Sequence, residues 1–267
     1  MTDERYDHDP PDLAQLFRVD GKVALVTGAG TGIGRMAARV LARAGATVIA
    51  TDLDGDAAAQ TAEAIKAEGL GAAALPMDVS NEGQVVAAFT QAREQHGPVG
   101  ILFNNAGIIR KAPSEELSLA DWNAVVDVNL TGVFLCAREA GKQMLAEGDG
   151  SIIIVSSMWG DSGGGLTPNI SYHATKTAVI GLTRALAVEW GPRGVRVNDI
   201  APTFIETRIT EPLFANADLV REIEAFAPLK RRGIPADLAG AVLYLASPAS
   251  SLVTGASLSV DGGWTAR

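Results

Sequence analysis

The chain has 267 residues, of which 47% are hydrophobic and 20% are charged, so it is long and apolar enough to bury a sizeable core. It carries 22 Lys and Arg against 31 Asp and Glu, and the net charge of −9 argues against a protein that neutralises nucleic-acid phosphates. One cysteine, Cys136, cannot form an internal disulfide, and the three histidines show no metal-ligand spacing, so we predict neither a disulfide nor a metal site.

Residues 1–17 are predicted to form an acidic, polar tail outside the fold. A secretory signal would need a basic start followed by an apolar stretch, and this segment has neither. The longest apolar runs further along, such as 152–155, are far too short to span a bilayer. We therefore expect a cytoplasmic protein without a membrane partner.

Short apolar and β-branched runs alternate with longer amphipathic stretches through the rest of the chain. Most of the runs lack polar alternation, which is typical of strands buried on both faces. The runs predict strands at 23–26, 47–50, 72–75, 101–103, 152–155, 195–200 and 257–260. The stretches between them predict helices near 33–44, 56–68, 82–96, 118–147, 172–190 and 235–246.

This alternation predicts an α/β fold in one domain, residues 18–267. Strand and helix follow each other six times before a seventh strand, as in a doubly wound parallel sheet with helices on both faces. Residues 204–230 are predicted to be an irregular loop inserted over the substrate. Loops after the carboxyl ends of the strands form the ligand crevice in such sheets, so functional residues are expected there.

A glycine-rich turn at 27–34 follows the first strand and opens directly into the first helix. Glycines let the chain turn tightly and let a pyrophosphate approach the backbone, while the helix N-terminus supplies free N–H groups. The placement between a buried strand and an amphipathic helix predicts a dinucleotide site. A tight turn without a ligand is the alternative.

Asp52 ends the second strand, 18 residues after Gly34, where an acidic side chain would meet the adenosine ribose. A carboxylate there accepts hydrogen bonds from the ribose hydroxyls and repels the 2′-phosphate of NADP. No basic residue stands at Thr31 or Leu53 to offset that repulsion. The sequence therefore favours NAD over NADP, with a solvated turn aspartate as the alternative.

Tyr172 and Lys176 stand four residues apart at the start of a helical stretch, so both project from one helix face. A phenol with a reference pKa near 10 is a poor base at neutral pH unless a nearby cation lowers that pKa. A pKa near 7 requires a shift worth about 4 kcal/mol, which Lys176 and an oxidised nicotinamide ring would share. The spacing suggests that Tyr172 is a general base and that Lys176 is the cation that lowers its pKa.

With these motifs the sequence resembles the short-chain dehydrogenases/reductases from about Lys22 to Trp264. The family's active-site residues match Asn129, Ser157, Tyr172 and Lys176. Its cofactor contacts match, in chain order, Gly28, Thr31, Gly32, Ile33, Gly34, Asp52, Leu53, Asp78, Val79, Asn105, Ala106, Gly107, Tyr172, Lys176, Pro202, Thr203, Ile205 and Thr207.

The resemblance implies a Rossmann-type fold, a nicotinamide cofactor and a homotetramer. It implies that Tyr172 is the base in alcohol oxidation, or the acid in carbonyl reduction, and that Ser157 holds the substrate oxygen. It implies that Lys176 contacts the nicotinamide ribose and lowers the pKa of Tyr172, while Asn129 supports a water relay to Lys176. The hydride itself moves to or from the cofactor.

Two features depart from the family pattern. Ser157 and Tyr172 are 15 residues apart where the family more often has 13, which predicts an expansion at 163–165 over the pocket. Ser156 is a second, less favoured candidate for the serine. The family's Pro-Gly after the sixth strand is here Pro202-Thr203, although Ile205 and Thr207 still fit contacts to the carboxamide.

The substrate is less well defined by the sequence. The segments 108–113 and 261–267 look like those of the family's sugar-acid and polyol dehydrogenases, such as gluconate 5-dehydrogenase. Two other functions stay open: a 3-ketoacyl or hydroxysteroid carbonyl reductase, and a dinucleotide sensor without turnover. The candidate substrate contacts are Arg110, Lys111, Met158, Trp159 and Arg208, and the cations among them have a solvated surface as their alternative.

Overall fold

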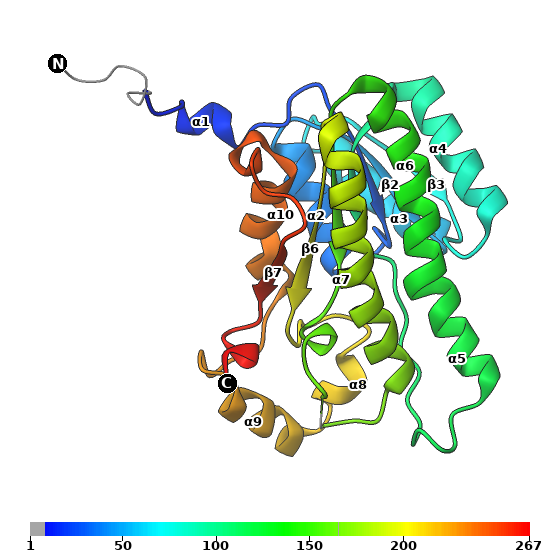
Figure 1. The fold of residues 1–267 in the computed structure, drawn as a ribbon, viewed down its shortest axis with the longest axis vertical. Coiled ribbons are helices and arrows are strands. Elements are labelled where there is room, and N and C mark those ends of the chain that lie inside the picture. The colour runs from blue at the N-terminus through cyan, green and yellow to red at the C-terminus, as the bar shows by residue number, and fades with distance from the viewer. Residues whose placement is uncertain (1–8, 165) are drawn as a thin grey trace.

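A single seven-stranded sheet forms the centre of the computed structural model, which describes residues 9–164 and 166–267 (Figure 1). The strand order is β3-β2-β1-β4-β5-β6-β7, and every neighbouring pair is parallel. The doubly wound parallel sheet predicted from the sequence is therefore confirmed. The strands are β1 (Val23–Thr27), β2 (Thr47–Asp52), β3 (Ala72–Pro76), β4 (Val99–Asn104), β5 (Gly150–Val155), β6 (Val195–Pro202) and β7 (Ser257–Val260).

Burial follows the position of each strand in the sheet. All residues of β1 and β5, near the middle of the sheet, are buried, which explains their largely apolar composition. The edge strands β3 and β7 are only half-buried along most of their length. The seven predicted runs lie within the seven observed strands, and the structure extends several of them by one or two residues.

Helices cover both faces of the sheet, and each set encloses its own apolar core. One face carries α2 (Gly32–Arg43), α3 (Gly55–Lys66) and α10 (Ala239–Ala246), which continues from a 3₁₀ turn at Pro235–Leu238. The other carries α4 (Glu82–His96), α6 (Val133–Glu147) and α7 (Ile170–Trp190). Cys136 of α6 is fully buried, and burial raises the pKa of its thiol to about 12, so it is a core residue rather than a nucleophile.

The helix predicted over 118–147 is interrupted by a wider turn. It consists of α5 (Leu119–Val126), a π-helical segment (Asp127–Gly132) and then α6. A π-helical segment shifts the side chains that follow it around the helix axis, and such segments often lie at functional sites. Here it contains Asn129, and Gly132 at its end lies against Val79.

The prediction of an irregular loop over 204–230 is wrong about its secondary structure, because the segment contains two helices. These are α8 (Glu211–Phe214) and α9 (Ala217–Phe226). Asn216 caps α9 by accepting hydrogen bonds from the backbone N–H groups of Asp218 and Leu219. Apolar residues of both helices, Leu213 and Ile223, are buried against a third apolar cluster next to the carboxyl ends of the strands.

The predicted tail lies partly outside the described residues. Its described part contains one helical turn, α1 (Leu13–Leu16), which Asp12 caps and which projects away from the sheet in Figure 1. Leu13 on this turn is 69% exposed. In residues 9–164 and 166–267, the helices are all too short or too polar to traverse a bilayer.

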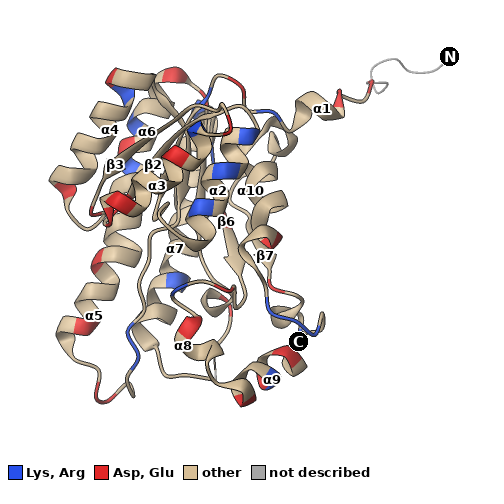
Figure 2. Cartoon of the chain, turned by 180° about the vertical axis from the view of Figure 1, so that it is seen from behind, with Lys and Arg blue, Asp and Glu red and all other residues tan. Residues whose placement is uncertain are grey.

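Charged residues of both signs are interspersed on the face shown in Figure 2. Arg39 and Arg43 of α2 both bind the carboxylate of Glu68, which follows α3. These exposed ion pairs contribute little stability individually. They engage two of the three arginines of α2, and the third, Arg35, donates to the Thr61 hydroxyl.

Gly141 of α6 offers a stability test of the packing between α6 and α7. A Cβ atom at Gly141 would lie 2.7 Å from the ring of Trp190, which is 8% exposed. We expect Gly141→Ala to lower the free energy of unfolding by about 1–2 kcal/mol in chemical denaturation. The control is Gly240→Ala in α10, where the added Cβ meets no atom within 4 Å and helix propensity predicts a gain of up to about 1 kcal/mol. Equal effects of the two substitutions would contradict the packing argument.

Candidate active site

The strand order reverses between β1 and β4, and a polar link joins the carboxyl ends of these two strands. The Thr27 hydroxyl oxygen accepts hydrogen bonds from the backbone N–H groups of Asn105 and Ala106, at 2.9 and 3.0 Å. The Asn105 carboxamide in turn donates to the carbonyl oxygens of Thr27 and Gly28. Connections on either side of such a reversal diverge and leave a crevice between them.

A groove of about 380 Å³ lies at this point. It runs from the turn after β2, past the glycine-rich turn, to the segment after β6. Its lining contains most of the predicted cofactor residues: Gly28, Thr31, Gly32, Ile33, Asp52, Leu53, Asp78, Val79, Asn105, Ala106, Gly107 and Thr207.

The backbone of the glycine-rich turn fits a bound pyrophosphate. Gly28 and Gly32 have φ values of +63° and +54°, which side-chain-bearing residues rarely adopt. A Cβ at Gly28 would lie 2.8 Å from the Asn105 carboxamide, so only glycine keeps this approach open. Thr31 precedes α2 without capping it through its side chain, which leaves the helix N-terminus available to an anion.

Gly34 does not line the groove as Gly28 and Gly32 do, because it faces the glycine-rich turn. A Cβ there would lie 2.1 Å from the carbonyl oxygen of Gly28, so this glycine permits close packing of α2 on the turn. Pro202 and Ile205 are likewise buried and do not line the groove.

Two carboxylates lie along the far part of the groove. Asp52 accepts hydrogen bonds from the backbone N–H groups of Gly30 at 2.8 Å and Asp54 at 3.0 Å. This fixes the carboxylate and leaves lone pairs for ribose hydroxyls. Asp78 accepts from both the backbone N–H and the hydroxyl of Ser80, so its carboxylate is engaged in the local turn.

Ser157 and Tyr172 meet in a small cavity of about 80 Å³ beyond the groove. Ser157 lies on the turn that follows β5, where its hydroxyl oxygen accepts from the Trp159 backbone N–H at 3.2 Å. Tyr172 lies in the first turn of α7, and Lys176 lies one turn further along. The Lys176 ammonium is 5.4 Å from the centre of the Tyr172 ring and donates to the Val155 carbonyl oxygen at 2.7 Å.

Burial governs the ionisation of this pair. Burial raises the pKa of the Tyr172 phenol, and the hydrogen bond with the Ser157 hydroxyl opposes that rise. Burial also lowers the pKa of Lys176 to about 8, although the charge of Asp199 opposes that shift. The cofactor-free site therefore holds a protonated phenol beside an amine whose charge depends on pH in the neutral to alkaline range.

Asn129 is held by the loop that follows β4. Its Oδ1 accepts from the Ile108 backbone N–H at 2.8 Å, and its Nδ2 donates to the Ile108 carbonyl oxygen at 2.9 Å. The side chain is fully buried. The π-helical segment thus ties its carboxamide to the loop that carries Gly107 on the groove wall.

Ser156 points away from the cavity, which disfavours it as the catalytic serine. Its hydroxyl donates to Asp199 and lies 3.0 Å from the Ile200 carbonyl oxygen on β6. Asp199 also accepts from Ser257 at 2.7 Å and is fully buried, and burial raises its carboxyl pKa. Among the two serines, the structure places only Ser157 on the cavity wall.

The predicted substrate contacts separate into two groups. Met158, Trp159 and Lys111 line the cavity with Ser157 and Tyr172. Arg208 lines the cofactor groove instead. Arg110 is exposed and lies 3.4 Å from the Asp121 carboxylate, outside the lining of the cavity.

Aromatic rings support the cavity from one side. The buried Trp159 ring packs edge-on against Phe204 and Trp264, with ring centres 5.6 and 5.9 Å apart. The His173 ring also packs against Trp159, with ring centres 5.3 Å apart, and its Nδ1 lies 3.1 Å from the Trp159 carbonyl oxygen. The expansion predicted at 163–165 lies near this histidine, since a Cβ at Gly164 would contact its ring; Gly165 is outside the described residues.

Several residues of the site were missed in the sequence. Thr27 was read only as the start of the glycine turn, and its link to Asn105 needs the strand order. Asp199 carries one signal, a charged residue within an apolar strand run. Asn169, which lines the cavity with Tyr172, carries no comparable signal.

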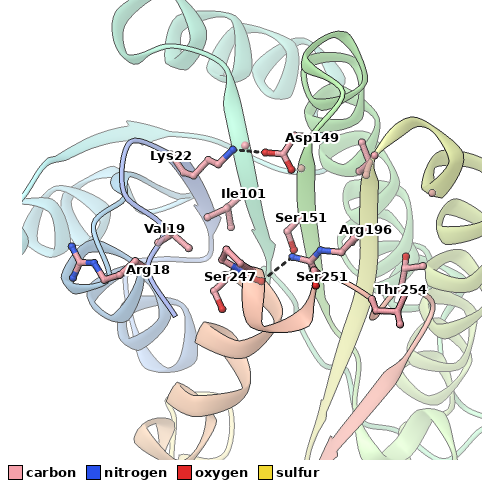
Figure 3. Close-up of a pocket in the computed structure, with 18 of the residues that line it drawn as sticks. Arg18, Val19, Lys22, Ile101, Asp149, Ser151, Arg196, Ser247, Ser251 and Thr254 are labelled. Carbon is pink, nitrogen blue, oxygen red and sulfur yellow. Dashed lines mark hydrogen bonds and ion pairs between the residues drawn. The ribbon is translucent and has the colours of Figure 1, made fainter. Parts of the chain in front are cut away.

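A second hollow, of about 550 Å³, lies at the opposite, amino ends of the strands (Figure 3). Its charged groups are engaged with each other, with the backbone or with a serine hydroxyl. Lys22 pairs with Asp149, and the Arg196 guanidinium donates to Ser250 at 2.7 Å and to the Leu245 carbonyl oxygen at 3.0 Å. Because the catalytic candidates lie at the other end of the sheet, this hollow is not the active site.

Comparison with known proteins gives concordant results. A family model described as enoyl-(acyl carrier protein) reductase matches residues 28–265. Galactitol 2-dehydrogenase of Rhizobium johnstonii is 40% identical over 94% of this chain and 98% of its own length. For 2-dehydro-3-deoxy-D-gluconate 5-dehydrogenase of Dickeya dadantii the identity is 39%, over 96% of this chain and all of the relative.

Solved structures agree with the fold. A gluconate 5-dehydrogenase from Burkholderia cenocepacia in complex with NADP and tartrate superposes with a TM-score of 0.92 and 38% identity. The match covers 96% of this chain and all of the other. A short-chain type dehydrogenase/reductase from Mycobacterium marinum gives the same TM-score, identity and coverage.

The buried Lys176 generates a prediction about stability and pH. Because its pKa falls from 10.5 to about 8 on folding, the folded state disfavours the charged amine, and the penalty is relieved as pH rises through this interval. We expect wild type to gain about 2–3 kcal/mol of unfolding free energy relative to Lys176→Met between about pH 7 and about pH 10. Denaturant titrations of the cofactor-free proteins measure the difference. A difference independent of pH would contradict the burial argument.

Proposed function

Since the chain belongs to the short-chain dehydrogenase/reductase family, we propose that it transfers a hydride between NAD and a secondary alcohol or ketone on a sugar, sugar acid or polyol. One observation carries the proposal above all others. Ser157 and Tyr172 share a small cavity next to the groove that contains the glycine-rich turn and Asp52, with the Lys176 amine beneath the phenol ring.

The proposed chemistry divides between the cofactor and these side chains. When bound, the nicotinamide ring supplies the hydride acceptor or donor. Tyr172 removes the hydroxyl proton in oxidation and returns it in reduction, and Ser157 donates a hydrogen bond to the reacting oxygen. Lys176, held by the Val155 carbonyl, supplies positive charge that stabilises the phenolate. In this proposal Asn129 positions the loop at Ile108 through its two hydrogen bonds. By the family resemblance it also supports a water relay to Lys176.

Two observations support a hydrophilic substrate. Relatives of 38–40% identity are named for galactitol, D-threitol and 2-dehydro-3-deoxy-D-gluconate. The cavity also carries polar side chains on several sides, including Lys111, Thr167 and Thr203. A carboxylate or a chain of hydroxyls would find partners among them.

The choice of NAD rests on Asp52. Its carboxylate lies in the groove with Leu53, a residue that is 76% exposed and carries no charge. A 2′-phosphate would be repelled there. The related Burkholderia enzyme holds NADP, so the choice of cofactor has to be measured for this chain.

Two expectations from the family resemblance and composition stay predictions. The first is a homotetramer. The exposed apolar side chains of Phe134 on α6 and Val188 on α7 are consistent with such an assembly. The second is a cytoplasmic location.

The proposed function is tested with a panel of polyols, sugar acids, hydroxysteroids and simple alcohols, supplied with NAD or NADP and followed by reduced-cofactor absorbance. We expect turnover of hydrophilic secondary alcohols. Tyr172→Phe should bind the cofactor but lose at least about 100-fold in kcat, because the proton acceptor is gone. Turnover of hydrophobic alcohols alone would reject the substrate class, and an active Tyr172→Phe enzyme would reject the base.

Cofactor choice is tested at Asp52. Asp52→Ala should lower the ratio of kcat/KM for NAD to that for NADP by about 10- to 100-fold, because repulsion of the 2′-phosphate is lost. Asp52→Asn is the matched variant, since its carbonyl oxygen can still accept from Gly30 while the charge is gone. We expect the same direction of change in both, and an unchanged ratio in both variants would remove Asp52 from the explanation.

A further inference from the structure

Arg208 lies on the segment that follows β6, and its side chain has no partner in the cofactor-free protein. The residue is exposed, and in residues 9–164 and 166–267 its guanidinium takes part in no ion pair. Arg232, at the other end of the same segment, instead binds the carboxylates of Glu206 and Glu224, at 3.1 and 3.2 Å. Glu206, two residues before Arg208, is thus already engaged, and the charge of Arg208 is left uncompensated.

The cofactor groove has an uneven distribution of charge. Among the described residues that line it, three are charged, namely Asp52, Asp78 and Arg208. Both carboxylates accept hydrogen bonds from backbone N–H groups or from Ser80, and neither is bound to a cation. A nicotinamide dinucleotide carries a negative charge on each of its two linked phosphates. Of the described lining residues, Arg208 alone can offer that pyrophosphate a positive side chain.

Packing brings Arg208 to the part of the groove where the pyrophosphate is expected. A Cβ atom at Gly32 would lie 3.0 Å from the Cγ2 atom of Thr207, the residue before Arg208. Gly32 is the first residue of α2, where free backbone N–H groups favour an anion. Asp52 lies at the end of β2 and is tied to Gly30 instead. The segment after β6 therefore meets the glycine-rich turn at the start of α2.

The backbone that carries Arg208 is held in a hydrogen-bonded turn. The Thr207 carbonyl oxygen accepts from the N–H groups of Thr210 and Glu211, both at 3.0 Å. The Thr207 N–H in turn donates to the Thr210 hydroxyl oxygen at 3.0 Å. Because this backbone is already ordered, binding would have to fix only the Arg208 side chain, which limits the entropic cost. A planar guanidinium can then donate two parallel hydrogen bonds to phosphate oxygens.

We propose that Arg208 is a cofactor-binding residue, whose guanidinium binds the pyrophosphate of the nicotinamide dinucleotide across the groove from the glycine-rich turn. The inference rests on the proposed function. It differs from the substrate contact predicted for Arg208 from the sequence. It also gives the pyrophosphate a cationic partner in addition to the backbone N–H groups of the turn.

The test measures binding to the cofactor-free protein by calorimetric titration with two probes. ADP-ribose carries the pyrophosphate, and adenosine does not. Arg208→Met should weaken ADP-ribose binding about 10-fold and change adenosine binding by less than about twofold, because a charge-assisted hydrogen bond to phosphate is lost. Arg208→Lys keeps the charge without the planar fork, so it should lose less than Arg208→Met. Equal losses for ADP-ribose and adenosine would overturn the inference.

A third probe, 2′-phospho-ADP-ribose, distinguishes the pyrophosphate from the 2′-phosphate of NADP. It is compared with ADP-ribose in an Asp52→Ala background, so that repulsion by this carboxylate does not mask its binding. Adding Arg208→Met should weaken both probes by the same factor. A larger loss for the 2′-phosphorylated probe would assign Arg208 to the ribose phosphate and contradict the proposal.

Salt dependence gives a second readout of the same contact. The affinity of wild type for ADP-ribose should fall as the salt concentration rises, because salt screens the attraction between the guanidinium and the phosphates. In Arg208→Met the affinity should fall less steeply. The same slope in both proteins would count against an ionic contact.

Arg93→Met is the matched control for the loss of one positive charge. Arg93 is exposed on the last turn of α4 and does not line the groove. Its replacement should change ADP-ribose binding by less than about twofold, because salt screens charges at that range. A loss equal to that of Arg208→Met would indicate an effect of net charge and overturn the inference.

The outcomes distinguish the inference from the proposed function. If wild type binds no ADP-ribose and oxidises no alcohol of the panel, the proposed function fails and the inference fails with it. If wild type oxidises polyols and Arg208→Met binds ADP-ribose as tightly as wild type does, the inference alone is overturned, and Arg208 is a solvated surface residue.

Discussion

The link between Thr27 and Asn105 holds together the point on which the rest of the site depends. The reversal of strand order obliges the chain to leave β1 and β4 in opposite directions, and a gap at their ends follows from that topology. Two backbone N–H groups and two carbonyl oxygens at this gap would lack partners in a dry interior. The hydroxyl and the carboxamide satisfy them, so the glycine turn and the loop with Gly107 stay at a fixed separation.

Burial determines the ionisation of the two candidate catalytic side chains and also destabilises their charged forms. Lys176 and Tyr172 lie in a region of low dielectric constant, where a charge acts more strongly on its neighbour than it would in water. The same burial disfavours the ammonium, and only the Val155 carbonyl and the distant charge of Asp199 offset that effect in the free chain. A phenolate formed during oxidation would add the missing opposite charge, so the ion pair is favoured when the reaction needs it.

The sequence predicted most of the fold because the buried parallel strands are largely apolar runs. Motif and spacing also singled out Ser157, Tyr172 and Lys176 as candidates, and the structure brings the first two into one cavity with the Lys176 amine beside the phenol ring. The π-helical segment around Asn129 was missed, because an extra residue in a helical turn leaves no mark on hydrophobic periodicity. Helix α9 was missed although the sequence carries its signal, because Asn216 is a favoured capping residue and Leu219, Ile223 and Phe226 follow it at helical spacing.

Substrate recognition depends on longer-range contacts than cofactor binding does. The groove is formed largely by backbone and glycines, which local sequence specifies, whereas the cavity wall brings together the turn at Trp159 and the segment that carries Phe204. The Trp159 N–H donates to the Ser157 hydroxyl oxygen, and its ring packs on Trp264, whose own ring contacts Phe226 of α9 at 4.3 Å. A displacement of α9 would therefore reach Ser157, the candidate catalytic serine, through two aromatic contacts. The packing thus connects the 204–230 segment both to the wall of the cavity and to the hydroxyl of Ser157.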